Sequence, residues 1–71
     1  MTTIRVTREL YDGVDHESYR NRMAFRVSFP DGVDCWSHNT ANVAARINGY
    51  RAGAKRPVDI DWRIRDIPCP V

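Results

Sequence analysis

The feature that most constrains the fold is an alternation of large apolar residues with small or polar residues over 22–29, followed directly by a turn sequence. Its apolar members lie on one face of an extended strand: Met23, Phe25, Val27 and Phe29. Residues 30–32 read Pro-Asp-Gly, in which proline presets φ, aspartate bonds its own backbone and glycine accepts a positive φ. Because residues 33–35 resume extended character, we expect a β-hairpin here.

Two further segments alternate in the same way. Residues 4–10 place Ile4, Val6 and Leu10 on the apolar face, where Arg8 is the exception and is expected at the sheet margin. Residues 58–64 point Val58, Ile60, Trp62 and Ile64 inward. Ile67 has the opposite parity, and the prolines at 68 and 70 predict an edge or a stiff tail after it.

A single helical segment is predicted over residues 38–48. Its apolar face carries Val43, Ala44 and Ile47. Ser37 or Asn39 supplies the N-cap, and Gly49 is expected to end the helix in the left-handed conformation. Residues 50–57 are then a basic, glycine-containing loop.

These elements predict one α+β domain spanning residues 1–71, in the order β-β-β-α-β, since a chain of this length has room for one core. We expect a small antiparallel or mixed sheet with one helix packed on one face. Because one helix cannot cover both faces, the other face should be left open.

The open face is predicted to carry much of the positive charge. The chain has ten arginines and one lysine against nine acidic residues, a formal net charge of +2. The polar parity comprises Arg5, Thr7, Arg22, Arg26, Ser28, Asp59, Asp61, Arg63 and Arg65. Two interpretations follow: a solvated face on which these charges pair with one another, or a docking surface formed by its five arginines.

A second candidate surface is the basic loop with Tyr50, Arg51, Lys55 and Arg56. Its three cations could grip phosphates while the Tyr50 ring stacks on a base. The alternative is an ordinary solvated connection between the helix and the last strand. Aromatic pairs on an exposed strand face, typical of RNA-binding modules, are missing, because Phe25 and Trp62 lie on the covered parity.

Residue types suited to metal binding occur without the usual spacing. Cys35 and His38 form one close pair, to which only the distant His16 and Cys69 could be added, whereas zinc sites usually combine two close pairs. We therefore expect no metal and no cofactor. Whether Cys35 and Cys69 form a disulfide stays open at this point.

Catalysis is not expected either. Asp15, His16 and Ser18 are the residue types of a hydrolytic triad, but neighbours in one loop cannot converge as triad members do. The chain has no signal-peptide pattern and no apolar run of the ~20 residues that cross a membrane. Two cysteines are too few for a secreted disulfide framework, so a cytoplasmic location is expected.

In layout the chain resembles the small phage-encoded inhibitors of bacterial defence systems, the anti-CRISPR proteins. The resemblance is carried by the strand at 23–29, the helix at 38–48, the strand at 58–64 and the charged faces around them. It covers most of the chain and involves no shared motif, so no functional residue carries over. It implies a surface that competes for the nucleic-acid or subunit contacts of a nuclease complex in the host cytoplasm.

The sequence therefore predicts a small non-catalytic binding protein, an inhibitor or adaptor that docks on a protein or nucleoprotein partner. The alternative is a small nucleic-acid-binding protein that uses the basic loop and the arginine-rich sheet face. A homodimer, formed by pairing an edge strand or by burying the open face, is a third hypothesis.

Overall fold

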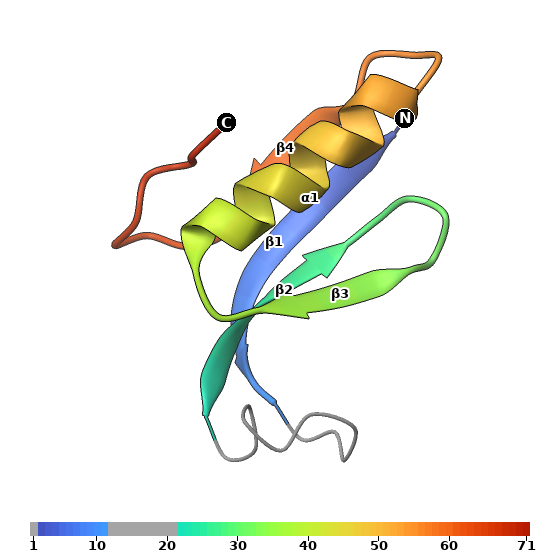
Figure 1. The fold of residues 1–71 in the computed structure, drawn as a ribbon. Helices are drawn as coiled ribbons and strands as arrows, with labels where there is room; N and C mark the ends of the chain where they lie inside the picture. Colours follow the sequence, from blue (N-terminus) through green and yellow to red (C-terminus); the bar gives the residue numbers. More distant parts are fainter. Residues whose placement is uncertain (1, 12–21) are drawn as a thin grey trace.

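The computed structural model describes residues 2–11 and 22–71, in which four strands form one sheet and one helix packs on it (Figure 1). The elements are β1 (Thr3–Leu10), β2 (Met23–Ser28), β3 (Asp34–Ser37), α1 (Thr40–Gly53) and β4 (Asp59–Trp62). The predicted α+β class and the order β-β-β-α-β are confirmed.

The sheet is mixed, with the strand order β3-β2-β1-β4. β1 and β3 each pair antiparallel with β2, whereas β4 pairs parallel with β1. Two parallel strands of one sheet need a crossover connection. Helix α1 provides it: it leaves the edge strand β3, crosses one face of the sheet and leads to β4 at the other edge (Figure 1).

The predicted hairpin turn joins β2 to β3. Phe29 donates its backbone N–H to the carbonyl of Val33 (2.9 Å), and the Asp31 carboxylate accepts from the Val33 N–H (3.2 Å). Gly32 has a φ of +92°, a conformation that side chains disfavour. Asp31 and Gly32 therefore take the roles expected of them, although β3 begins only at Asp34.

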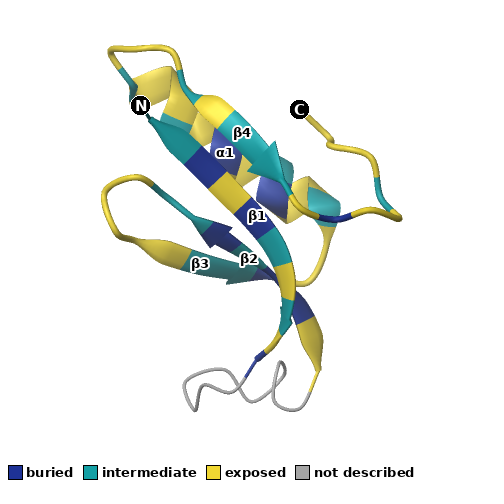
Figure 2. Ribbon diagram, turned by 180° about the vertical axis from the view of Figure 1, so that it is seen from behind, coloured by how far each residue is buried: buried dark blue, intermediate teal, exposed yellow. Residues whose placement is uncertain are grey.

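The core lies between the sheet and α1. Buried apolar side chains from the two central strands, the helix and the segment after β4 form it: Ile4, Val6, Phe25, Val27, Val43, Ile47 and Ile64. Partly buried residues pack around this cluster: Phe29, Cys35, Tyr50, Val58, Ile60, Trp62 and Ile67. Figure 2, seen from the side opposite α1, shows that no described helix or strand covers the other face of the sheet.

The apolar alternation extends farther along β1 and β2 than the core does. Leu10 and Met23 are opposite each other in the antiparallel register, and they are 55% and 57% exposed. This end of the two strands runs past the end of α1 (Figure 1), so no helix lies over it. The prediction that Leu10 belongs to the core is therefore wrong.

The helix also differs from its predicted bounds. Asn39 is the N-cap, and its side-chain oxygen accepts from the N–H of Asn42 (2.8 Å). Gly49 does not end the helix, which continues through Gly53, so Tyr50 and Arg51 are helical and not loop residues. The Tyr50 ring stacks on Phe29, with the ring centroids 4.9 Å apart. This contact gives the additional turn a packing partner.

No helix in the described part of the chain is long and apolar enough to cross a membrane.

The segment after β4 turns back toward the helix side of the sheet. Trp62 donates its indole N–H to the carbonyl of Ile67 (2.7 Å), which explains how Ile67 packs on the core despite its parity. Arg8 pairs with Asp66 (3.1 Å) while its guanidinium lies 5.5 Å from the centre of the Phe25 ring. Arg8 is thus accommodated at the apolar face by its ion pair with Asp66 and by its contact with the Phe25 ring.

Candidate docking surface

We call the side of the sheet away from α1 the open face. The strand register assigns its members by alternation: Thr3, Arg5, Thr7 and Glu9 in β1; Ala24, Arg26 and Ser28 in β2; Asp34 and Trp36 in β3; and Asp59 and Asp61 in β4. Six of these eleven side chains are charged. All but Asp59 belong to two groups that differ in how completely their charges are paired.

The first group lies over the β1–β2–β3 side of the sheet and centres on Arg26. Its guanidinium bonds Glu9 (3.3 Å) and Asp34, carboxylates on the strands to either side. It also lies 5.8 Å from the centre of the Trp36 ring, and Tyr11 meets that ring edge-on at 5.0 Å. Arg26 is therefore held by two acids and an aromatic ring.

The ionisation of this group follows from those contacts. The hydrogen bond from Arg26 lowers the pKa of the Asp34 carboxyl, and the Ser28 hydroxyl contributes further. In turn, the hydrogen bond to Asp34 raises the pKa of Arg26. Both groups are charged at neutral pH, and two carboxylates offset the single guanidinium. This half of the open face matches the interpretation of a self-paired surface.

The second group lies where β4 ends beside β1. Asp61 accepts from Nε of Arg63 on both carboxylate oxygens (2.9 Å each), and Nε of Arg5 lies 3.5 Å away from it. Next to this cluster is an open depression of about 680 Å³. It is lined by Arg5, Thr7, Trp62, Arg63, Ile64 and Arg65.

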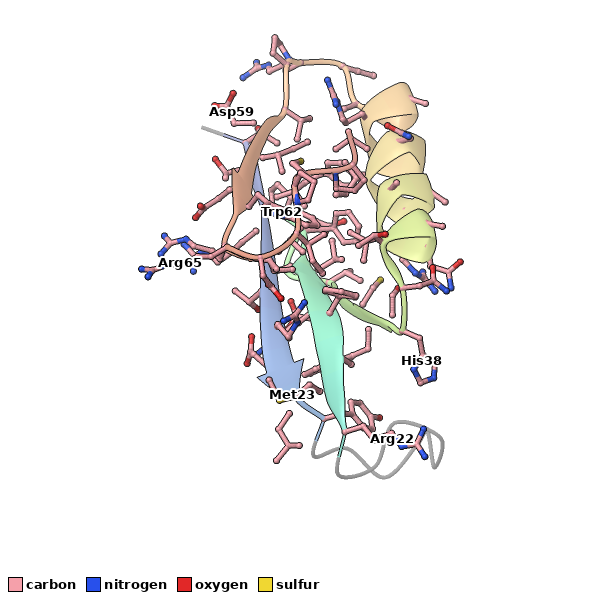
Figure 3. All side chains as sticks on the ribbon, turned by 90° about the vertical axis from the view of Figure 1, so that its left-hand side faces the viewer. Arg22, Met23, His38, Asp59, Trp62 and Arg65 are labelled. Atoms are coloured by element: carbon pink, nitrogen blue, oxygen red, sulfur yellow. The ribbon has the colours of Figure 1, made fainter. Side chains whose placement is uncertain are left out.

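The depression keeps a positive charge because its cations outnumber the carboxylate that pairs with them. Arg65 projects away from α1 (Figure 3) and makes no ion pair with any described residue. Arg5 and Arg63 share Asp61, and the ion pair of each with this carboxylate is at Nε. No hydrogen bond joins their terminal Nη groups to an acidic residue within residues 2–11 and 22–71. Exposed pairs of this kind are weak enough to exchange with other partners.

The five arginines predicted on the sheet face therefore separate into three environments. Arg5, Arg63 and Arg65 come together at the depression. Arg26 belongs to the self-paired group. Arg22 precedes β2 at the far end of the sheet and points in a different direction from Arg65 (Figure 3).

The basic segment at 50–57 is only partly a loop, because α1 extends to Gly53. Lys55 and Arg56 are exposed and line a smaller depression of about 260 Å³ with Thr2, Tyr50 and Ala54. Arg51 stands on the last turn of α1. Because the Tyr50 ring stacks on Phe29 at an interplanar angle of 24°, one of its faces is already covered. Base stacking on Tyr50 would have to use the other face.

Of the residues considered for metal binding, the structure describes Cys35, His38 and Cys69. Cys35 is half-buried with Nη1 of Arg46 3.7 Å from its sulfur, Cys69 is exposed, and both cysteines are free. Residues 2–11 and 22–71 contain no group of three or more His, Cys, Asp or Glu side chains that could hold a metal ion. Asp15, His16 and Ser18 lie outside the described residues.

Sequence reasoning missed the aromatic part of the open face. Trp36 was not assigned to a face, although the signal was present: Cys35 faces the core, so the next residue in an extended strand faces away from it. Tyr11 follows β1 and reaches the same ring.

Comparisons with known protein families, with curated proteins and with solved structures find no match to this chain.

Proposed function

We propose that this protein is a small non-catalytic binding protein, an inhibitor or adaptor, that docks through its open face on a macromolecular partner. The observation that supports it is the positive depression at the end of β4, where Arg5, Arg63 and Arg65 meet beside a face that no described helix or strand covers. Arginine is enriched at binding hot spots because its planar fork makes several directed hydrogen bonds.

The aromatic group on the β3 side of the open face adds to this proposal. Trp36 is half-buried on the open face, with Arg26 over its ring and Tyr11 against its edge. Trp, Tyr and Arg are the residue types that contribute most to binding energy at protein interfaces. The open face thus combines an aromatic patch toward β3 with a cationic depression toward β4, an arrangement suited to a protein or nucleoprotein surface.

Affinity capture with a matched pair of charge reversals tests the proposal. Arg65→Glu changes the depression without breaking an ion pair in the described chain, and Arg56→Glu makes the same charge change at the basic loop. We expect the tagged wild type and Arg56→Glu to retain one common partner and Arg65→Glu to lose it, with thermal midpoints within a few degrees. Equal retention of that partner by Arg65→Glu would overturn docking through this part of the open face.

The likeness in layout to anti-CRISPR inhibitors supplies a first class of partner for direct assay. Added to a CRISPR nuclease complex, the wild type is expected to slow target cleavage and Arg65→Glu is expected not to.

The nucleic-acid alternative is supported by Lys55 and Arg56, which have no ion pair within the described residues. It predicts DNA binding that weakens steeply with salt and is lost in a Lys55→Gln/Arg56→Gln variant.

A further inference from the structure

We infer that the depression beside β4 is a clamp for the carboxylates of an acidic protein segment, with Asp61 as the residue that positions two of its arginines. This inference rests on the proposed function, because it specifies the kind of partner surface that the open face receives. Arg5 and Arg63 both contact Asp61 through Nε.

The contacts with Asp61 orient the two arginines without occupying their forks. Arg63 donates only from Nε to Asp61, and the ion pair of Arg5 with the same carboxylate is also at Nε. A guanidinium has five N–H donors, four of them on the terminal nitrogens. Those terminal nitrogens bind a carboxylate with two parallel hydrogen bonds. Asp61 therefore fixes the inner edge of each guanidinium and leaves the terminal donors to a ligand.

The depression is also prepared for more than one carboxylate. Arg65 lines it with no ion pair to a described residue, so a third guanidinium is available beside the first two. The β1–β4 register holds Arg5 opposite Asp61, and Arg63 continues that ladder by donating its backbone N–H to the carbonyl of Val6 (2.9 Å). Two of the three cations are thus positioned by backbone pairing before any ligand arrives.

The charge pattern around the clamp favours an acidic protein segment over a nucleic-acid backbone. Carboxylates interrupt the open face at Asp59 and Asp61 on β4, at Glu9 on β1 and at Asp34 on β3. A nucleic acid carries a negative charge at every phosphate, so a strand laid along this face would run over these acids. A protein segment can place its Asp or Glu side chains at the three arginines and neutral residues elsewhere.

An NMR titration of the isotope-labelled protein with hexaglutamate at low ionic strength tests this inference. Perturbed backbone amides are expected to cluster at Arg5, Thr7 and residues 63–65. Arg65→Gln is expected to weaken binding about tenfold, the loss of one charged hydrogen-bond donor group. Arg63→Lys conserves charge but lacks the planar fork that bonds a carboxylate with two parallel hydrogen bonds, so it should also weaken binding. Arg56→Gln and Arg56→Lys are the matched controls and should bind as the wild type does.

Three outcomes would overturn the clamp: equal weakening by Arg65→Gln and Arg56→Gln, full affinity in Arg63→Lys, or tighter binding of hexathymidylate than of hexaglutamate at these same amides. Absence of hexaglutamate binding by the wild type would overturn it too. The capture experiment separates this failure from that of the proposed function. If Arg65→Glu loses its partner while hexaglutamate does not bind, docking through the open face stands and the clamp falls.

Discussion

Arg63 donates from Nε to both carboxylate oxygens of Asp61, two residues earlier in the chain, at 2.9 Å each. The same carboxylate reaches Arg5 on the neighbouring strand because the parallel register places Arg5 opposite Asp61. A contact within one strand and a contact between two strands therefore converge on one acid. The positive depression exists only when β4 lies beside β1.

This cluster is expected to matter more for binding than for stability. The side chains of Arg5 and Arg63 are 62% and 60% exposed, and exposed ion pairs contribute less than about 1 kcal/mol. Asp61→Asn should lower the free energy of unfolding in urea by no more than that. Asp59→Asn, at a carboxylate without an ion pair to a described residue, is the control. A loss above about 2 kcal/mol would mean that Asp61 has a structural role beyond these pairs.

A substitution at Gly49 can test whether the helix ends at this residue. It lies inside α1, and a Cβ added there meets nothing within 4 Å. Gly49→Ala should therefore stabilise the protein by about 0.5–1 kcal/mol, because alanine loses less backbone entropy in a helix. Gly32→Ala should destabilise it, since Gly32 has a φ of +92°. Thermal unfolding of both variants measures the difference. Destabilisation by Gly49→Ala would indicate a left-handed helix end at this residue.

The hydrogen bond from Trp62 to the Ile67 carbonyl is expected to hold down the C-terminal segment. Trp62→Phe keeps an aromatic ring but removes the donor, and should cost about 1–2 kcal/mol. It should also speed tryptic cleavage after Arg65. Trp36→Phe is the matched control, because none of the side-chain hydrogen bonds in the described part of the chain involves the Trp36 indole nitrogen. Equal cleavage rates in the two variants would contradict this role of Trp62.

Stability should fall in acid. The pKa values of Asp34 and Asp66 lie below their ordinary value of 3.8 because Arg26 and Arg8 bond the ionised forms. A carboxyl whose pKa is lower in the folded state stabilises the fold above the unfolded pKa and loses this contribution as pH falls through the folded pKa. Urea midpoints should therefore decrease as pH falls below about 3.8. Asp34→Asn should be less stable than the wild type at neutral pH and show a shallower acid slope.

Local patterns in the sequence were sufficient for most of the elements. The alternation around Phe25 predicted β2, the Pro-Asp-Gly turn predicted the hairpin, and Asn39 was one of two N-caps considered. The errors have nonlocal causes. The local sequence predicts a helix end at Gly49. The helix continues past it because the Tyr50 ring stacks on Phe29, which is distant in the chain. Leu10 continues an apolar pattern past the point that the helix reaches.

The candidate site was predictable in composition and not in arrangement. Strand parity placed Arg5 and Asp61 on the open face, as the register has them. It could not show that β4 pairs with β1, which is what brings Arg63 and Arg65 beside Arg5 and leaves Arg26 in another group. Parity says which side of a sheet a residue occupies, whereas strand order decides which residues are neighbours.

The parallel pairing of β1 with β4 also has a consequence for synthesis on the ribosome. β1 can pair with β2 early, but its other edge has no strand beside it until the helix and the crossover have emerged and β4 has docked. Until then a nascent chain exposes an unpaired backbone edge to neighbouring chains. It also lacks the depression, because Arg63 and Arg65 are translated after most of the domain. A truncated product that ends before β4 would therefore expose the edge without gaining the binding surface.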